Sequence, residues 1–242
     1  MTLIQSIIFS FVQGITEFLP ISSSGHLHLF QYFFSLSTSL AFDVFLNTAT
    51  FVAVLFYFRS QVPYFFKNIR YIIIGSLPAV IVGVFLKDQV ELIFSSVKTL
   101  PYEFLFTATI LLLTRFFKTK NNSLSYSKAF LIGVFQALAI VPAISRSGST
   151  IFAGLLLGLS PLNAFNFSFC LFIPASLGAL ILDIKDIANL PDFGPNYLIA
   201  FVLTAVIGYF SLIILQKVLV GKKFWLFSIY LFILSVVLLF IF

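Results

Sequence analysis

Two stretches of the chain align with each other without a gap, and this repetition decides the fold. They are Gln13-Gly-Ile-Thr-Glu-Phe-Leu-Pro-Ile-Ser-Ser-Ser-Gly25 and Gln136-Ala-Leu-Ala-Ile-Val-Pro-Ala-Ile-Ser-Arg-Ser-Gly148, which are 123 positions apart. Because 123 is about half of the 242 residues, we expect one domain made of pseudo-repeats at about 1–120 and 121–242. Each copy sets a serine-rich turn inside apolar sequence, as expected where a broken helix lines a cavity at membrane depth.

The composition places the chain in a membrane. Hydrophobic residues make up 60% of it and charged residues only 9%, whereas soluble domains carry about 25% charged residues. The net charge of +6 could suggest a nucleic-acid partner, but the basic residues lie in short segments between apolar stretches. This distribution follows the positive-inside rule, so it reports membrane topology and argues against nucleic-acid binding.

Apolar segments predict an all-α polytopic membrane protein. Six segments are long enough to span a hydrocarbon core of about 30 Å: roughly 40–58, 69–86, 101–117, 163–182, 197–216 and 224–242. Two further apolar stretches, about 2–36 and 127–159, are interrupted by the repeated turns. Each is expected to be a re-entrant helix pair, and the alternative is that each crosses the membrane twice.

The charge of the connecting segments predicts an inverted repeat. Segments 59–70, 115–128 and 217–223 are basic, whereas 87–98 and 183–192 are of mixed charge or acidic. The basic segments are therefore placed in the cytoplasm and both termini outside. Since each half has three spans, the second half starts on the opposite face, and the two turns can meet near the midplane.

The first copy carries a carboxylate inside apolar sequence. Such a group is costly in a membrane unless it is paired or functional, so Glu17 is a candidate functional residue. Gln13 lies one helical turn earlier and gives a second oxygen on the same face, which would suit a divalent hard cation. The alternative is that Glu17 caps the end of a broken helix. Asp43 and Asn47 either extend this site or cap the next helix.

The polar turn that follows Glu17 has the groups for binding and activating a phosphate. Hydroxyls and backbone amides of a turn that leads into a helix can cradle an anion, and an imidazole can act as acid, base or nucleophile. We expect His28 to be structural or interfacial. The candidate residues in this turn are Ser22, Ser23, Ser24 and His26.

The second copy differs from the first by an arginine. Arg146 stands at the position of Ser23, and its planar fork of donors matches phosphate oxygens. A permanent charge in an apolar segment needs an anionic partner, which is either a substrate phosphate or Glu17 in a structural ion pair. The neighbouring hydroxyls favour phosphate; they belong to Ser145, Ser147, Ser149 and Thr150.

Together these groups could hold a phosphate ester or anhydride and activate a nucleophile. The substrate should be amphipathic, with its head in the cavity and its tail in the bilayer. A transporter or flippase without hydrolysis and a small-anion channel remain alternatives, because inverted repeats are common in transporters. The asymmetry favours an enzyme, since only the first copy carries Glu17 and His26 and only the second carries Arg146.

The paired motifs resemble the two signature regions of the undecaprenyl-pyrophosphate phosphatases, the bacitracin-resistance family. The motifs are Gln13-x-x-x-Glu17-Phe-Leu-Pro-Ile-Ser-Ser-Ser-Gly-His26 and Pro142-Ala-Ile-Ser-Arg-Ser-Gly-Ser-Thr150. The resemblance implies hydrolysis of a C55-isoprenyl pyrophosphate to the monophosphate, which recycles the lipid carrier of cell-wall synthesis. By position, it implies catalytic roles for Gln13, Glu17, Ser23 and His26, with Ser23 or His26 as nucleophile unless water attacks, and phosphate-binding roles for Ser22, Ser24, Ser145, Arg146, Ser147 and Thr150.

The resemblance also implies a cofactor, partners and a location. Mg²⁺ or Ca²⁺ would bind at Glu17 and Gln13, and the partners would be a polyprenyl pyrophosphate and membrane lipids. The location would be the bacterial inner membrane, with the site toward the outer face; the oligomeric state stays open, with a homodimer as one arrangement. The family's second motif usually has glycine where this chain has Ala143, a change that matters only if that position needs a positive φ.

Overall fold

A computed structural model describes residues 2–34, 40–86, 89–90, 92, 96–117, 122–188 and 194–242, and every regular element in these ranges is helical. Parts of the predicted loops 87–98, 115–128 and 183–192 lie outside the described residues. The elements are α1 Leu3–Thr16, α2 Ser23–Phe34, α3 Leu40–Tyr57, η1 Arg59–Gln61, α4 Val62–Lys67, α5 Ile69–Phe85, α7 Leu100–Leu113, η2 Thr114–Phe116, α8 Tyr126–Leu138, α9 Arg146–Leu156, α10 Pro161–Ala188, α11 Pro195–Val220, η3 Phe224–Leu226 and α12 Phe227–Ile241.

The predicted re-entrant regions each consist of two helices joined by a turn, α1 with α2 and α8 with α9. A capping box starts α1, where Thr2 Oγ1 accepts from the Gln5 backbone N–H and Gln5 Oε1 accepts from that of Thr2. Pro20 and Pro142 lie in the two turns, where their missing N–H and fixed φ do not favour continued helix. Both apolar stretches are therefore interrupted within the repeated motifs, at 17–22 and 139–145. The predicted serine-rich turns differ in one respect, because the residues from Ser23 and from Arg146 onward belong to the first turns of α2 and α9.

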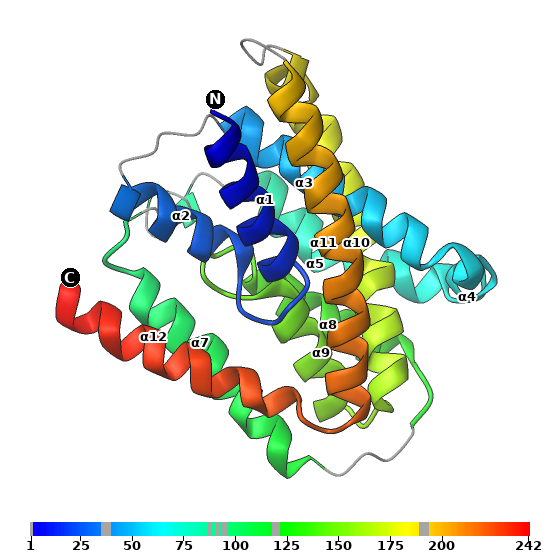
Figure 1. Cartoon of the computed structure of the whole chain (residues 1–242). Coiled ribbons are helices and arrows are strands. Elements are labelled where there is room, and N and C mark those ends of the chain that lie inside the picture. The colour runs from blue at the N-terminus through cyan, green and yellow to red at the C-terminus, as the bar shows by residue number, and fades with distance from the viewer. Residues whose placement is uncertain are drawn as a thin grey trace.

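The helices of the two halves correspond at the same offset as the motifs. Shifting α1 and α2 by 123 positions gives 126–139 and 146–157, which match α8 and α9. Packing follows the same correspondence (Figure 1): α1 packs against α11 and α5 against α8, while α3 packs against α10 and α7 against α12. At this offset α3, α5 and α7 correspond to α10, α11 and α12. Exchanging the two halves therefore maps these four helix contacts onto one another. Inversion of the halves across a membrane stays a prediction.

Small residues allow one of these helix pairs to approach very closely. A Cβ built on Gly133 of α8 would lie 2.0 Å from the backbone oxygen of Gly75 in α5. Such contacts between backbones are typical of helix packing in membranes, where small residues let helices interlock.

Fewer helices satisfy the length of a membrane span than the sequence predicts. Among the described residues, three are long and apolar enough, within Pro161–Ile181, Pro195–Val220 and Phe224–Ile241. A fourth arises if Phe42–Tyr57 and Arg59–Lys67, bent by 58°, count as one span. The predicted spans at 69–86 and 101–117 are helical and short: α5 has 17 residues, and the 14 of α7 continue into η2, at the lower limit of the roughly 17–25 residues of a span.

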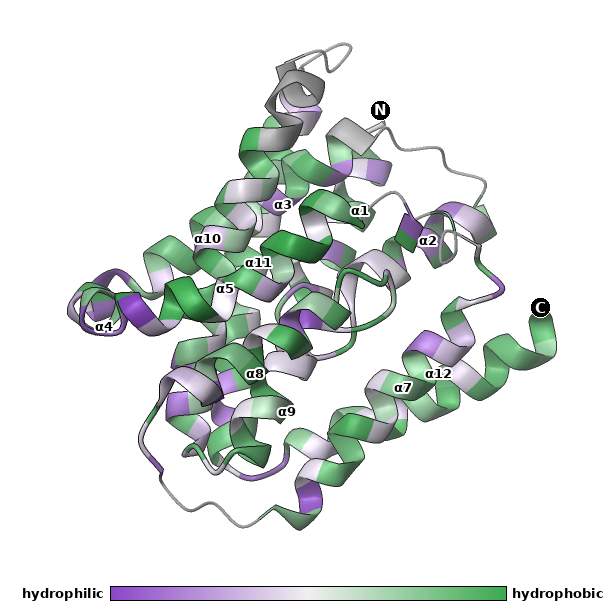
Figure 2. Cartoon of the chain, turned by 180° about the vertical axis from the view of Figure 1, so that it is seen from behind, coloured by the Kyte–Doolittle hydropathy of each residue, from purple (hydrophilic) through white to green (hydrophobic). Residues whose placement is uncertain are grey.

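The basic segment 59–70, predicted as a loop, is mostly helical. It forms η1 and α4, and Pro63 lies in the first turn of α4, where proline is well tolerated. Figure 2 shows hydrophilic residues in α4, whereas α12 is predominantly hydrophobic. The bundle is thus apolar over its long helices, and charge gathers at the helix ends.

Candidate active site

The two repeated turns are bonded to each other inside the bundle. Ser22 Oγ donates to the Pro142 carbonyl at 2.6 Å, and Ser24 Oγ donates to the same oxygen. A Cβ on Gly25 would lie 2.9 Å from Ala143 Cβ, and one on Gly148 would lie 3.3 Å from Pro20 Cβ. Positions 20 and 143 correspond in the repeat, as do 25 and 148, so each turn packs its proline or alanine on the glycine of the other.

An ion pair joins the halves at this junction. Arg146 Nη2 lies 2.6 Å from Glu17 Oε1, and the side chains are 18% and 11% exposed. The guanidinium carbon lies 3.8 Å from the centre of the Phe172 ring of α10, which covers one face of the guanidinium. Both predicted partners of the arginine therefore stay relevant: it pairs with Glu17 here, and its remaining N–H groups can bind phosphate.

A hydrogen-bond network surrounds the second carboxylate oxygen. Glu17 Oε2 accepts from Ser23 Oγ at 2.5 Å and from Gln13 Nε2 at 3.1 Å. Gln13 Nε2 also donates to Asn47 Oδ1 at 2.6 Å. Asn47 of α3 therefore extends the site, which is one of the two alternatives that the sequence left open for it. Gln13 Oε1 is buried and has no protein partner among the described residues.

His26 is oriented by two hydrogen bonds that define its tautomer. Its Nδ1 lies 2.7 Å from the Ser22 carbonyl oxygen, which can only accept, so Nδ1 carries the proton. Its Nε2 lies 2.7 Å from the Tyr230 hydroxyl of α12, which then donates. These contacts tie the imidazole to the turn and to α12, and its direct catalytic role stays a prediction.

The backbone conformation of Ser22 supports this arrangement. Its φ is 68°, an uncommon value for a residue other than glycine. At the same position of the second copy, Ser145 has a φ of −68°. The strained first turn, which leads into the helix that carries Ser23 and His26, is therefore locally different from the second, as is common where surroundings enforce a functional geometry.

Helix α7 holds the second turn in place. Glu103 Oε2 accepts from the Ala143 backbone N–H at 2.8 Å. Thr107 Oγ1 lies 3.2 Å from both the Ala143 carbonyl and the Ser145 N–H. Ala143 is fully buried and does not have a positive φ, so alanine fits where the resembling family usually has glycine.

The predicted phosphate-binding hydroxyls of the second turn are bonded within the protein. Ser145 Oγ caps α9 by accepting from the Gly148 N–H at 3.1 Å and lies 3.3 Å from Ser147 Oγ. Thr150 Oγ1 lies 2.6 Å from Ser168 Oγ of α10. These bonds fix α9, which begins at Arg146 and directs its positive end toward the ion pair. Contact with a phosphate stays a prediction for all three.

Several residues of the site were not predicted from the sequence. Glu103 could have been found, because it is an ionisable residue in an apolar segment, the same signal that identified Glu17. Phe172, Tyr230 and Ser168 carry no local signal. Their contribution depends on tertiary packing that brings α10 and α12 to the turns.

Fold and site together define a class: multi-pass α-helical membrane proteins in which two related halves each supply one charged group to a shared, partly buried site. Within it, the chain belongs to the family described as bacitracin resistance protein BacA, whose model matches residues 6–237.

Curated relatives cover nearly the whole chain. A protein of Methanobrevibacter smithii named undecaprenyl-diphosphatase is 36% identical over 98% of this chain and 96% of its own length. A protein of Thermosipho melanesiensis with the same name is 38% identical over 93% of this chain and 94% of its own. In Bacillus cereus, undecaprenyl-diphosphatase 1 is 36% identical over 94% and 93%. The similarity therefore extends through both halves and includes both turns.

Proposed function

We propose that this protein is an enzyme that hydrolyses undecaprenyl diphosphate to undecaprenyl phosphate and inorganic phosphate. The relatives' names support the reaction, and the Glu17–Arg146 pair is the observation that carries it. A guanidinium that is partly exposed beside a carboxylate can bind an anionic head group while the carboxylate handles a proton.

Arg146 is the residue that we propose binds the diphosphate. One of its N–H groups bonds Glu17 and the Phe172 ring supports its face, which leaves other donors of the fork for phosphate oxygens. The first backbone N–H groups of α9 add a positive dipole at the same place. The second turn thus supplies the charge that neutralises the head group.

Ser23 is the proposed nucleophile and Glu17 its base. The Ser23 hydroxyl donates to Glu17 Oε2 at 2.5 Å, so its proton can pass to the carboxylate as the oxygen attacks the terminal phosphorus. The bond from that phosphorus to the bridging oxygen breaks, and undecaprenyl phosphate leaves. Water then releases phosphate from the serine ester. His26, with both ring nitrogens already bonded, is less available to attack.

A divalent cation, Mg²⁺ or Ca²⁺, fits beside this pair. Gln13 Oε1 is a buried oxygen without a protein partner in the described part of the chain, and Glu17 and Asn47 supply further hard oxygen donors nearby. Among the described residues no group of three His, Cys, Asp or Glu side chains could hold a metal, and the candidate donors here are two amide oxygens and one carboxylate. When bound, the cation would neutralise diphosphate charge.

Phosphate release tests the function. Purified protein in detergent should release phosphate from farnesyl or undecaprenyl diphosphate, and Glu17→Gln should remove nearly all of this activity. EDTA should abolish release and added Mg²⁺ or Ca²⁺ should restore it. A flippase would move the lipid between leaflets and release no phosphate, so a folded wild-type protein without release would overturn the proposal.

The cellular setting of this proposal is the bacterial plasma membrane, with the site open toward the outer face. The basic segments that follow α3, α7 and α11 support this orientation by the positive-inside rule. A homodimer stays a prediction.

A further inference from the structure

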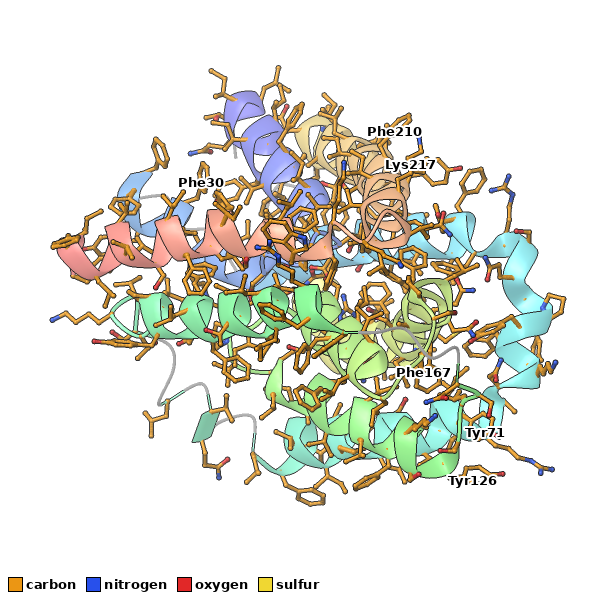
Figure 3. The ribbon with its side chains drawn as sticks, turned by 90° about the horizontal axis from the view of Figure 1, so that it is seen from below. Phe30, Tyr71, Tyr126, Phe167, Phe210 and Lys217 are labelled. Atoms are coloured by element: carbon orange, nitrogen blue, oxygen red, sulfur yellow. The ribbon has the colours of Figure 1, made fainter. Side chains whose placement is uncertain are left out.

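An apolar pocket of about 220 Å³ lies between α2 and α12. Its apolar lining comes from Leu29, Phe30 and Phe33 of α2 and from Leu234, Val237, Leu238 and Ile241 of α12. Figure 3 shows Phe30 on α2 beside α12. The two polar side chains in its lining are the hydrogen-bonded pair His26 and Tyr230.

The pocket has a polar end and an apolar end. His26 and Tyr230 come first along their helices, and the apolar lining residues follow on later turns of both. At the far end, the Phe242 ring lies 6.2 Å from that of Phe33. From Tyr230 to Ile241 the pocket therefore extends for about 16 Å along α12, at 1.5 Å per residue.

The polar end adjoins the proposed reaction centre. His26 Nδ1 donates to the Ser22 carbonyl, and the next residue, Ser23, donates to Glu17. One peptide unit therefore separates the start of the pocket from the carboxylate network. A molecule with its diphosphate at Arg146 would have the mouth of this pocket next to its head group.

The pocket is open at the outer surface of the protein. Phe33, Val237 and Ile241 are all about half exposed on the outer surface of the bundle. At 220 Å³ it is also smaller than the roughly 300–1,000 Å³ pockets that enclose drug-sized ligands. A long chain could thus place only its first part here, and the rest would continue into the bilayer.

We infer that the pocket between α2 and α12 binds the head-proximal isoprene units of the substrate's prenyl chain, with the His26–Tyr230 pair at the boundary between head and tail. This inference rests on the proposed function. Branched apolar units suit the aromatic and aliphatic walls, and the polar pair lies where the diphosphate begins. We place the tail in this pocket because His26, at its polar end, lies in the same first turn of α2 as Ser23.

Two adjacent valines of α12 provide a matched test. Val237 lines the pocket and Val236 does not, and their exposures are close, at 47% and 49%. We expect Val237→Trp to raise KM for farnesyl diphosphate about tenfold, the effect of losing burial of roughly two methylene groups. It should leave kcat and the hydrolysis of five-carbon dimethylallyl diphosphate nearly unchanged. Val236→Trp should leave both substrates unchanged.

The outcomes separate this inference from the proposed function. Equal KM values for farnesyl diphosphate in the two variants would mean that bulk lipid fills the pocket. An equal loss of activity on both substrates in Val237→Trp would mean that α12 acts on the reaction centre. Either result overturns the inference. If wild type hydrolyses nothing, the proposed function fails. A farnesyl diphosphate carrying a diazirine on its terminal isoprene unit then tests the pocket: competable labelling within residues 234–241 supports it, and labelling elsewhere refutes it.

Discussion

At the scale of single residues, the site depends on one carboxylate and one guanidinium that meet across the repeat. Arg146 donates one N–H to Glu17, and in the proposed function its other donors bind the substrate. Lysine has the same charge but lacks the planar fork and cannot rest on Phe172 in the same way. The arginine's geometry therefore matters beyond its charge.

Arg146→Lys should lower phosphate release about 100-fold, the typical loss when a donor to the reacting charge is removed. Release from farnesyl diphosphate measures the effect, and the thermal unfolding midpoint in detergent checks that the variant is folded. Near-normal turnover in a folded Arg146→Lys protein would argue against bidentate binding of phosphate.

The charged pair could be predicted from the sequence, but its surroundings could not. The repeat aligns Arg146 with Ser23, which lies six residues after Glu17. Both residues are charged within apolar sequence, which marks them as candidate functional residues. The ion pair between Arg146 and Glu17 emerged only from the structure, and contact of Arg146 with a phosphate stays a prediction. Tyr230 carried no signal, since a tyrosine near the end of an apolar helix is common at membrane interfaces.

At the scale of elements, α7 positions the second turn through two side chains one helical turn apart. Glu103 holds the Ala143 N–H, while Thr107 contacts the adjoining backbone. An unpaired buried N–H costs about 1–3 kcal/mol. Loss of Glu103 should therefore both destabilise the protein and shift the segment that presents Arg146.

Glu103→Leu should lower the unfolding midpoint and raise KM for farnesyl diphosphate. Glu103→Gln keeps an acceptor for the Ala143 N–H and should restore KM close to that of wild type. Measuring kcat and KM for both variants separates a positioning role from a catalytic one. If the glutamine variant were as defective in kcat as a Glu17→Gln protein, Glu103 would act in the reaction instead.

Helix packing between the halves offers a stability test. Gly133→Ala should destabilise the protein, because the new methyl would lie 2.0 Å from the Gly75 carbonyl oxygen. Gly178→Ala in α10 is the control, since a methyl group added there would meet nothing within 4 Å among the described residues. Thermal unfolding in detergent should show a lower midpoint for the first variant alone; equal midpoints would mean that α5 and α8 adjust easily.

The lengths of the apolar segments and the residues that interrupt them predicted where helices occur. They did not predict how the connecting segment 59–70 folds or where each helix ends. The turns at Pro20 and Pro142 interrupt helices where expected. Nothing in the sequence indicated that 59–70 would fold as η1 and α4, because its charge suggested a loop. Nor did hydropathy fix where α5 and α7 end, since helix ends depend on capping and packing as well.

At the scale of the whole molecule, neither half contains a complete site. Glu17, Ser23 and His26 belong to the first half and Arg146 to the second, and helix pairs such as α1 with α11 and α5 with α8 hold the halves together. The apolar surfaces of these pairs should allow separate halves to associate in a membrane.

Chains 1–120 and 121–242 should each be inactive alone and should recover phosphate release when produced together. Introducing Glu17→Gln into the first fragment should abolish the recovered activity, which confirms that it arises at the shared site. Activity from either fragment by itself would contradict the assignment of one site to both halves.

The mutual packing of the two turns also bears on ancestry. A half-length precursor could have assembled as a pair of identical subunits, with each glycine seated against the partner's proline or alanine as Gly25 and Gly148 are now. Such a pair cannot carry serine on one turn and arginine on the other. Fusion into one polypeptide lets positions 23 and 146 diverge, and with them the division of labour between proton transfer and anion capture.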